Sequence, residues 1–118
     1  MQIQERTVGA VTILDLKGKL MLGDGDTLLK DKVRSLVSRG CRQLVLNLAD
    51  VPNIDSVGIG EIVGTYTTIT RRGGSLNLLN VPKRIHDLLV ITKLLTVFET
   101  FDTETEAVRS FFPPGTKS

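Results

Sequence analysis

The chain has 118 residues, of which 41% are hydrophobic and 24% are charged, and its formal net charge is +2. These values are typical of one globular domain, and so small a net charge gives no electrostatic reason to expect binding to nucleic acid or to a membrane surface. Cys41 is the one cysteine, which excludes an internal disulfide and favours a reducing compartment. The first residues lack the apolar core of a signal peptide, and no apolar run reaches transmembrane length, so we expect a cytoplasmic protein without membrane insertion.

The first half of the chain predicts two strands, a loop, a helix and a third strand. The strands span residues 2–6 and 11–17, and in the second we expect Val11 and Ile13 to point inward and Thr12 to point outward. Residues 20–26 form a loop with two glycines and two acids. A helix then runs to Arg39, and its apolar positions recur near helical spacing: Leu28, Leu29, Val33, Leu36 and Val37.

The second half alternates strands with helices. The strand over residues 43–48 is apolar almost throughout, which predicts a central strand covered on both faces. The remaining predicted elements are a helix over 57–72, a strand over 75–79, a helix over 83–90, a strand over 97–101 and a helix over 103–112. The last six residues, 113–118, are expected to be a flexible tail. This order predicts an α/β fold with a mixed sheet.

The segment from Asn53 to Gly60 carries the main functional signal. It places Ser56 in the first turn of a helix, where unpaired backbone N–H groups favour negative charge. Such a serine can be a helix N-cap, a nucleophile or a phosphate acceptor. An N-cap alone does not explain glycines at 58, 60 and 64, because each glycine inside a helix costs up to about 1 kcal/mol relative to alanine. These glycines indicate close backbone approach or a flat surface for a partner.

The sequence lacks the residue patterns that catalysis or metal binding would require. A serine hydrolase needs a histidine that is oriented by a third group, and the sequence offers only His86, followed by Asp87 on a short helix. No Gly-x-Ser-x-Gly elbow, phosphate-binding loop or ligand-spaced His and Cys pair is present. We therefore predict a protein that is not an enzyme and that needs no cofactor and no metal.

The segment over residues 45–60 resembles the signature of the STAS family, the bacterial anti-sigma factor antagonists. The core of the resemblance is Asp-Ser-x-Gly-aliphatic-Gly, beginning at Asp55, after an apolar strand that bears Asn-Leu. Further matching segments lie at residues 16–20, 64–66, 72–74 and 94–98. The resemblance extends over about residues 5 to 110.

This resemblance implies a single domain over residues 1–112, with a mixed sheet of four to five strands flanked by about four helices. It implies that an anti-sigma factor serine kinase phosphorylates Ser56 and that a PP2C-type phosphatase reverses the modification. The unphosphorylated protein would bind the kinase and so release a sigma factor. The residues expected to contact the partner are Asp24, Asp26, Asp55, Ser56, Val57, Gly58 and Gly60.

One position departs from the family pattern. Family members often carry an acid directly after Gly-x-Leu in the first loop, whereas this chain has Met21 there. Asp24 and Asp26 follow within the same loop and are candidates to replace it. The alternative function is a phosphorylation-independent STAS adaptor subunit of a stress-sensing or lipid-transport complex.

Overall fold

The computed structural model describes residues 1–112 and contains five strands and four helices in the predicted order. The elements are β1 (Gln2–Val8), β2 (Val11–Lys17), α1 (Asp26–Ser38), β3 (Gln43–Asp50), α2 (Ser56–Thr70), β4 (Ser75–Leu79), α3 (Lys83–Ile91), β5 (Glu99–Phe101) and α4 (Glu104–Arg109). The predicted α/β class, with a mixed sheet and four helices, is confirmed. The expected tail, residues 113–118, lies outside the described residues.

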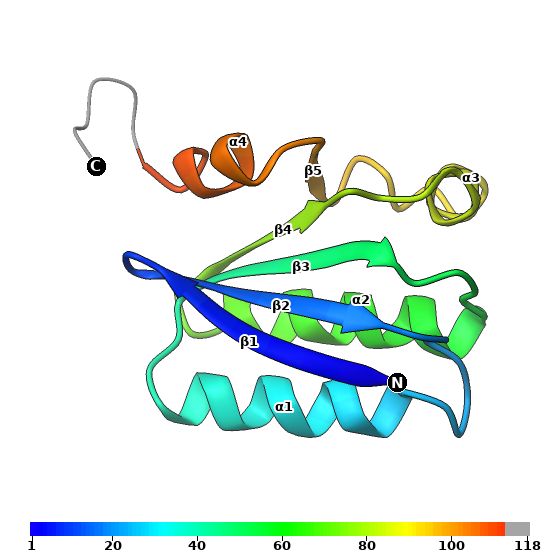
Figure 1. Ribbon diagram of the computed structural model, residues 1–118, viewed down its shortest axis with the longest axis horizontal. Helices are drawn as coiled ribbons and strands as arrows, with labels where there is room; N and C mark the ends of the chain where they lie inside the picture. The colour runs from blue at the N-terminus through cyan, green and yellow to red at the C-terminus, as the bar shows by residue number, and fades with distance from the viewer. Residues whose placement is uncertain (113–118) are drawn as a thin grey trace.

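The strands form one sheet in the order β1-β2-β3-β4-β5. β1 pairs with β2 in antiparallel fashion through a short turn at Gly9, and all other neighbours are parallel. Helices α1 and α2 lie side by side against one face of the sheet, while α4 lies on the opposite side and α3 lies beyond β4 (Figure 1). The predicted central position of β3 is confirmed.

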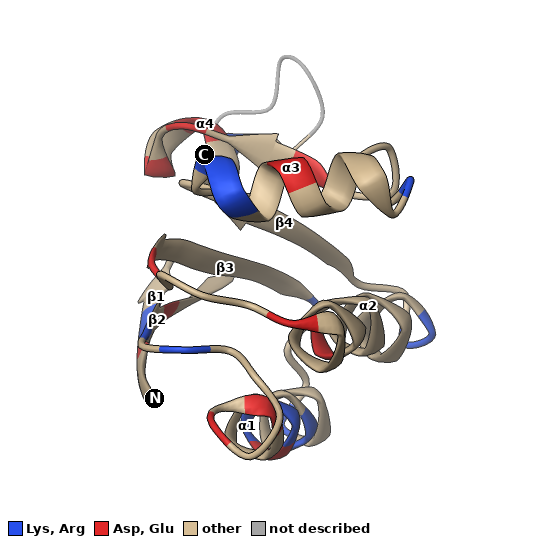
Figure 2. Ribbon diagram, turned by 90° about the vertical axis from the view of Figure 1, so that its right-hand side faces the viewer, with Lys and Arg blue, Asp and Glu red and all other residues tan. Residues whose placement is uncertain are grey.

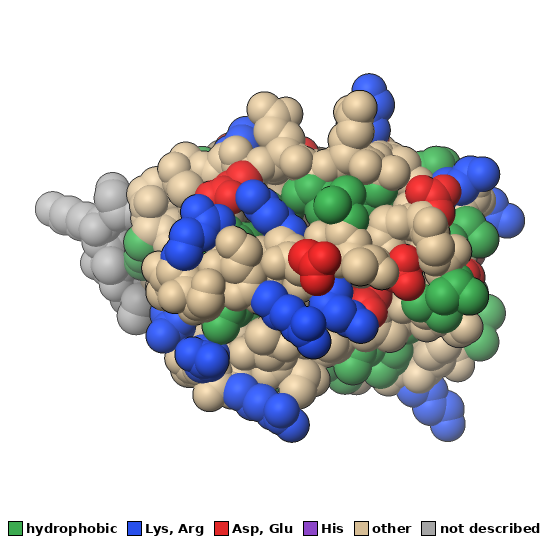
Figure 3. Space-filling model, turned by 90° about the horizontal axis from the view of Figure 1, so that it is seen from below, with side chains coloured by type: hydrophobic (Ala, Val, Ile, Leu, Met, Phe, Trp, Pro, Cys, Tyr) green, Lys and Arg blue, Asp and Glu red, His purple; other side chains and the backbone are tan. Residues whose placement is uncertain are grey.

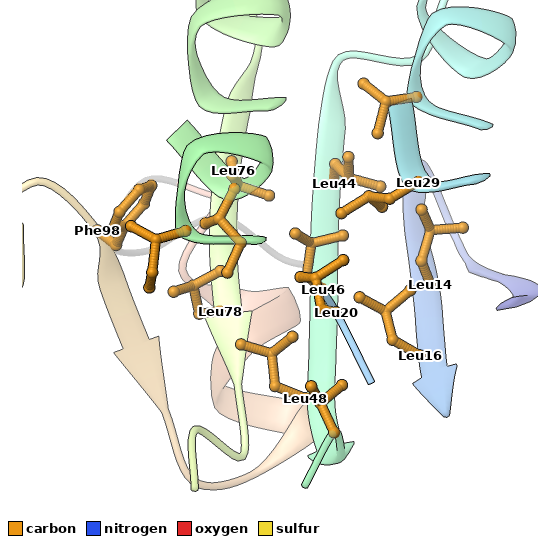
Figure 4. Close-up of a cluster of buried hydrophobic side chains, with 14 of the residues drawn as sticks. Leu14, Leu16, Leu20, Leu29, Leu44, Leu46, Leu48, Leu76, Leu78 and Phe98 are labelled. Carbon is orange, nitrogen blue, oxygen red and sulfur yellow. The ribbon is translucent and has the colours of Figure 1, made fainter. Parts of the chain in front are cut away.

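Two hydrophobic clusters hold these layers together, one on each face of the sheet. The larger cluster fills the space between the sheet and the helices, and Figure 4 shows Leu29 of α1 beside leucines of β2 and β3, while the leucines of β4 lie toward Phe98. The smaller cluster lies under α4 and consists of Val11, Ile13, Val45, Leu79 and Ala107. β2 is therefore covered on both faces, and the prediction that Thr12 points to solvent is wrong, since it is only 9% exposed.

The helix α1 corrects one further expectation. Leu29, Val33, Leu36 and Val37 are buried, as their spacing predicts. Leu28 is 46% exposed, because it lies about 100° around the helix from Leu29 and falls outside the buried stripe.

The C-terminal elements are shorter than the sequence predicts. β5 begins at Glu99 instead of residue 97, and α4 ends at Arg109 instead of residue 112. The last described residues continue as a tight turn, in which the N–H groups of Phe111 and Phe112 donate to carbonyls three residues earlier. This turn brings both aromatic rings against the smaller cluster.

Candidate functional site

The helix α2 begins with a carboxylate that joins two distant segments. Asp55 is the N-cap of α2, and its Oδ1 accepts a hydrogen bond from the N–H of Gly58 at 2.8 Å. Its Oδ2 accepts from the N–H of Leu22 at 3.0 Å, in the segment between β2 and α1 that we name the β2–α1 loop (residues 18–25). The N–H of Leu22, followed by that of Gly58, holds the pKa of Asp55 below its ordinary value. Asp55 is thus a charged clamp between the loop and the helix.

Ser56 is the first residue of α2, and its side chain is exposed. The hypothesis that Ser56 is the N-cap is wrong, because Asp55 has the extended backbone of a cap (φ −117°, ψ −173°) and provides the capping oxygen. The serine hydroxyl is therefore presented at the surface, next to the positive end of the helix.

The β2–α1 loop packs directly on this helix start. The N–H of Leu20 donates to the carbonyl of Asn53 at 3.0 Å, and Leu20 forms a parallel bridge with Ile54. Gly58 is buried here, and a Cβ added to it would lie 1.9 Å from the carbonyl oxygen of Leu20. Glycine at position 58 is therefore required by the close approach of two backbone segments.

Two acids lie at the end of this segment, Asp24 within the β2–α1 loop and Asp26 directly after it. Asp26 is the first residue of α1, and its Oδ1 accepts from the N–H of Gly23 at 3.0 Å. Asp24 is exposed and exchanges two backbone hydrogen bonds with Met21, both 2.9 Å long. Leu22, which sequence reasoning did not single out, is 71% exposed at the tip of the loop. The sequence feature that could have identified Leu22 is a large apolar side chain within an acidic, glycine-rich loop.

Gly60 contrasts with Gly58. It is exposed, and a Cβ added to it would meet no heavy atom within 4 Å; the same holds for Gly64. Close approach within the described chain explains one of the three helix glycines and leaves two unexplained. Val57, the remaining predicted contact residue, is half-buried.

A hollow of about 450 Å³ opens beside Ser56, between α2 and α3, and we name it the α2–α3 groove. In Figure 2, α3 lies above α2. The groove is lined by Ile54, Asp55, Ser56, Ile59, Gly60, Val63, Leu88, Thr92 and Leu94. The α3 side of this groove is not among the residues that the sequence pattern singles out. Four consecutive apolar residues, Leu88 to Ile91, exceed one helix face and were its signal.

The surface around α1 has a different character. Lys30 pairs with Glu61 at 3.3 Å, and Lys32 pairs with Glu5 at 2.7 Å. Figure 3 shows Lys and Arg side chains spread over this face, with hydrophobic side chains toward the end of the molecule that carries the β2–α1 loop. Solvated ion pairs of this kind contribute little to stability and give no indication of a binding site.

Metal chemistry and membrane crossing find no support in residues 1–112. No three side chains of His, Cys, Asp or Glu gather there into a possible metal site. His86 is exposed and lies 3.7 Å from its neighbour Asp87. Within the same part of the chain, no helix is both long enough and apolar enough to span a bilayer.

Comparisons with known proteins agree on one family. The family model described as STAS domain matches residues 2–107. The anti-sigma F factor antagonist of Paenibacillus polymyxa is 29% identical over 108 residues, which cover 92% of each chain. The crystal structure of a Thermotoga maritima protein, described as a candidate anti-sigma factor antagonist, matches with a TM-score of 0.86 and 28% identity over 92% of each chain.

The anti-sigma factor antagonist SpoIIAA shares the fold at lower identity. Its unphosphorylated form matches with a TM-score of 0.73 at 19% identity, over 93% of this chain and 97% of that one. The phosphorylated form of SpoIIAA, from Bacillus, also gives 0.73, at 18% identity, over 94% of this chain and all of that one. The same fold is thus found with and without the phosphate.

Proposed function

This chain belongs to the STAS domain family, and we propose that it is an anti-sigma factor antagonist that phosphorylation of Ser56 switches off. The observation that carries the proposal is the exposed Ser56 hydroxyl at the start of α2, directly after the clamp Asp55. The names of the relatives supply the class of partner.

The position of Ser56 suits a phosphate acceptor. An anti-sigma factor serine kinase would transfer the γ-phosphoryl group of ATP to the serine oxygen, with loss of the hydroxyl proton and release of ADP. The modified residue would carry about −1.5 to −2 charges at the positive end of α2. The helix end can accept this charge without unfolding, since backbone N–H groups at a helix start bind anions.

The same charge would act against a partner packed on this surface. Burial of an incompletely paired charge in an interface costs several kcal/mol, whereas a serine hydroxyl costs far less to desolvate. The unmodified protein would therefore bind the anti-sigma factor and release the sigma factor, and the phosphorylated protein would not bind.

The partner surface in this proposal consists of the helix start and the adjoining loop. Its residues are Asp24, Asp26, Asp55, Ser56, Val57, Gly58 and Gly60. Gly58 and Asp55 act indirectly, because their contacts within the chain hold the loop against α2. Asp24, Ser56 and Gly60 are exposed and are available for direct contact.

The remaining parts of the proposal concern the cellular setting. A PP2C-type phosphatase would hydrolyse the phosphoserine and restore the binding form. The chain itself would be a regulatory module of the cytoplasm and not an enzyme, working as a single domain over residues 1–112.

Phosphate mapping tests the proposal. The purified chain, incubated with its anti-sigma factor kinase and ATP, should gain one phosphate, and peptide mass spectrometry should locate it on Ser56. The threonines at the other end of α2 are an internal control: Thr65 is 3% exposed, and its hydroxyl donates to the carbonyl of Glu61 at 2.8 Å. Phosphate found only among residues 65–70, or equal incorporation into a Ser56→Ala variant, would overturn the assignment.

A further inference from the structure

The α2–α3 groove has an apolar interior with one polar end. Its depth is formed by aliphatic side chains of both helices and of the segments that adjoin them: Ile54, Ile59, Val63, Leu88 and Leu94. Asp55 and Ser56 line one end. The Asp55 carboxylate already accepts hydrogen bonds from two backbone N–H groups, so it does not need a cation from an occupant.

The two rims of the groove differ. On the α3 side, Ile91 is 75% exposed and lies on the same helix face as Leu88, the groove-lining residue three positions before it. On the α2 side, Gly60 leaves the helix backbone bare, and no atom within 4 Å explains the missing side chain. One rim therefore offers an apolar anchor, and the other permits close approach of a second backbone.

We propose that the α2–α3 groove receives an amphipathic helix of the anti-sigma factor, whose aliphatic side chains fill the groove while its backbone passes close to Gly60. This inference rests on the proposed function and extends its binding surface from the helix start to α3. The groove is continuous with that surface, since Ser56 is part of both. A groove between two helices with an apolar interior suits the packing of a third helix, and it offers no strand edge for an extended peptide.

The position of Ser56 at the groove end accounts for the switch within this proposal. A phosphate there would stand beside an apolar, desolvated contact and beside the carboxylate of Asp55. Both effects oppose entry of an aliphatic helix, and neither requires a change in the fold.

The test uses pairs of variants that separate binding from stability. Gly60→Leu adds a side chain in the groove, and Gly64→Leu adds the same side chain one turn further along, outside the groove lining. Both replace an exposed helix glycine, so both should raise the thermal midpoint by about 2–5 °C. Gly60→Leu should weaken binding of the purified anti-sigma factor kinase at least tenfold, and Gly64→Leu should leave it within twofold.

A second pair tests the other rim. Ile91→Asp should weaken binding at least tenfold, while Val8→Asp, an exposed apolar position at the β1–β2 turn, should not. A photoreactive amino acid at position 91 should crosslink to a helical segment of the kinase. Crosslinking to a second copy of this chain, or to an extended loop of the kinase, would overturn the choice of occupant.

The outcomes distinguish this inference from the proposed function. If the unmodified chain binds the kinase and Ser56→Asp does not, while Gly60→Leu and Ile91→Asp bind as tightly as the unmodified chain, the groove proposal is wrong and the switch proposal stands. If the unmodified chain binds no anti-sigma factor, both fail.

Discussion

The inner and outer sides of the first turns of α2 use glycine for different reasons. On the inner side, a Cβ at Gly58 would lie 1.9 Å from the Leu20 carbonyl oxygen, so the fold itself excludes any side chain. On the outer side, Gly60 has open space around it. A glycine there destabilises the helix relative to alanine, and no contact within the described chain requires it. The comparison indicates that the inner side maintains the shape of the site, and that the outer side is shaped for something that binds to it.

The largest effect is expected on the inner side. Gly58→Ala should destabilise the protein by about 3 kcal/mol or more, since the added atom meets backbone, which cannot move aside as a flexible side chain can. Gly60→Ala is the matched control and should instead stabilise the protein by up to about 1 kcal/mol. Urea unfolding monitored by circular dichroism measures both changes. Equal midpoints for the two variants would remove the distinction between the two sides.

A smaller effect is expected at Asp55, which joins the two sides. Asp55→Asn leaves one acceptor oxygen for two N–H donors, so either Leu22 or Gly58 loses its partner. The variant should be less stable than the parent at pH 7, though by less than Gly58→Ala, and its Leu22 amide should exchange hydrogen faster.

This effect of Asp55 should depend on pH in one direction. The pKa of Asp55 is lower in the folded state than its unfolded value near 3.8, so the stabilisation is present above that value and is lost as the pH falls through the folded pKa. The difference between parent and Asp55→Asn, followed by thermal melts from pH 7 to pH 2, should therefore shrink below about pH 4. A difference that stays constant over this range would contradict the role of the charged carboxylate.

The smallest effect is expected at Ser56. Because Asp55 caps α2, Ser56→Ala should change the free energy of unfolding by less than about 0.5 kcal/mol. Chemical denaturation of the parent and the variant measures this difference. A decrease of about 1 kcal/mol in the free energy of unfolding would instead indicate that Ser56 caps the helix.

Much of the fold follows from local patterns in the chain. Apolar periodicity predicts each helix and strand, and the apolar strand ending at Asp50 is the centre of the sheet. One error lies where neighbouring layers decide whether a side chain is buried. Thr12 is buried because β2 is covered on both faces, which its alternating pattern does not reveal.

The site shows a similar division. The sequence locates Ser56 at the start of a helix, but the choice between Asp55 and Ser56 as the cap depends on the backbone angles at residue 55. The bond from Leu22 to Asp55 joins residues 33 positions apart, and no local pattern predicts it. The sequence also assigns the same cost to Gly58 and Gly60, which differ only through what lies opposite each of them.

Isothermal titration calorimetry of Ser56→Asp against the anti-sigma factor kinase tests the central claim most directly. An acid at the start of α2 is favourable by about 0.3–1 kcal/mol, so the variant should melt at or slightly above the parent temperature. It should nevertheless bind the kinase at least a hundredfold more weakly, a loss of about 3 kcal/mol, because its charge must be desolvated in the interface. Folded Ser56→Asp that binds as tightly as the parent would contradict the charge-based switch and would favour the phosphorylation-independent adaptor.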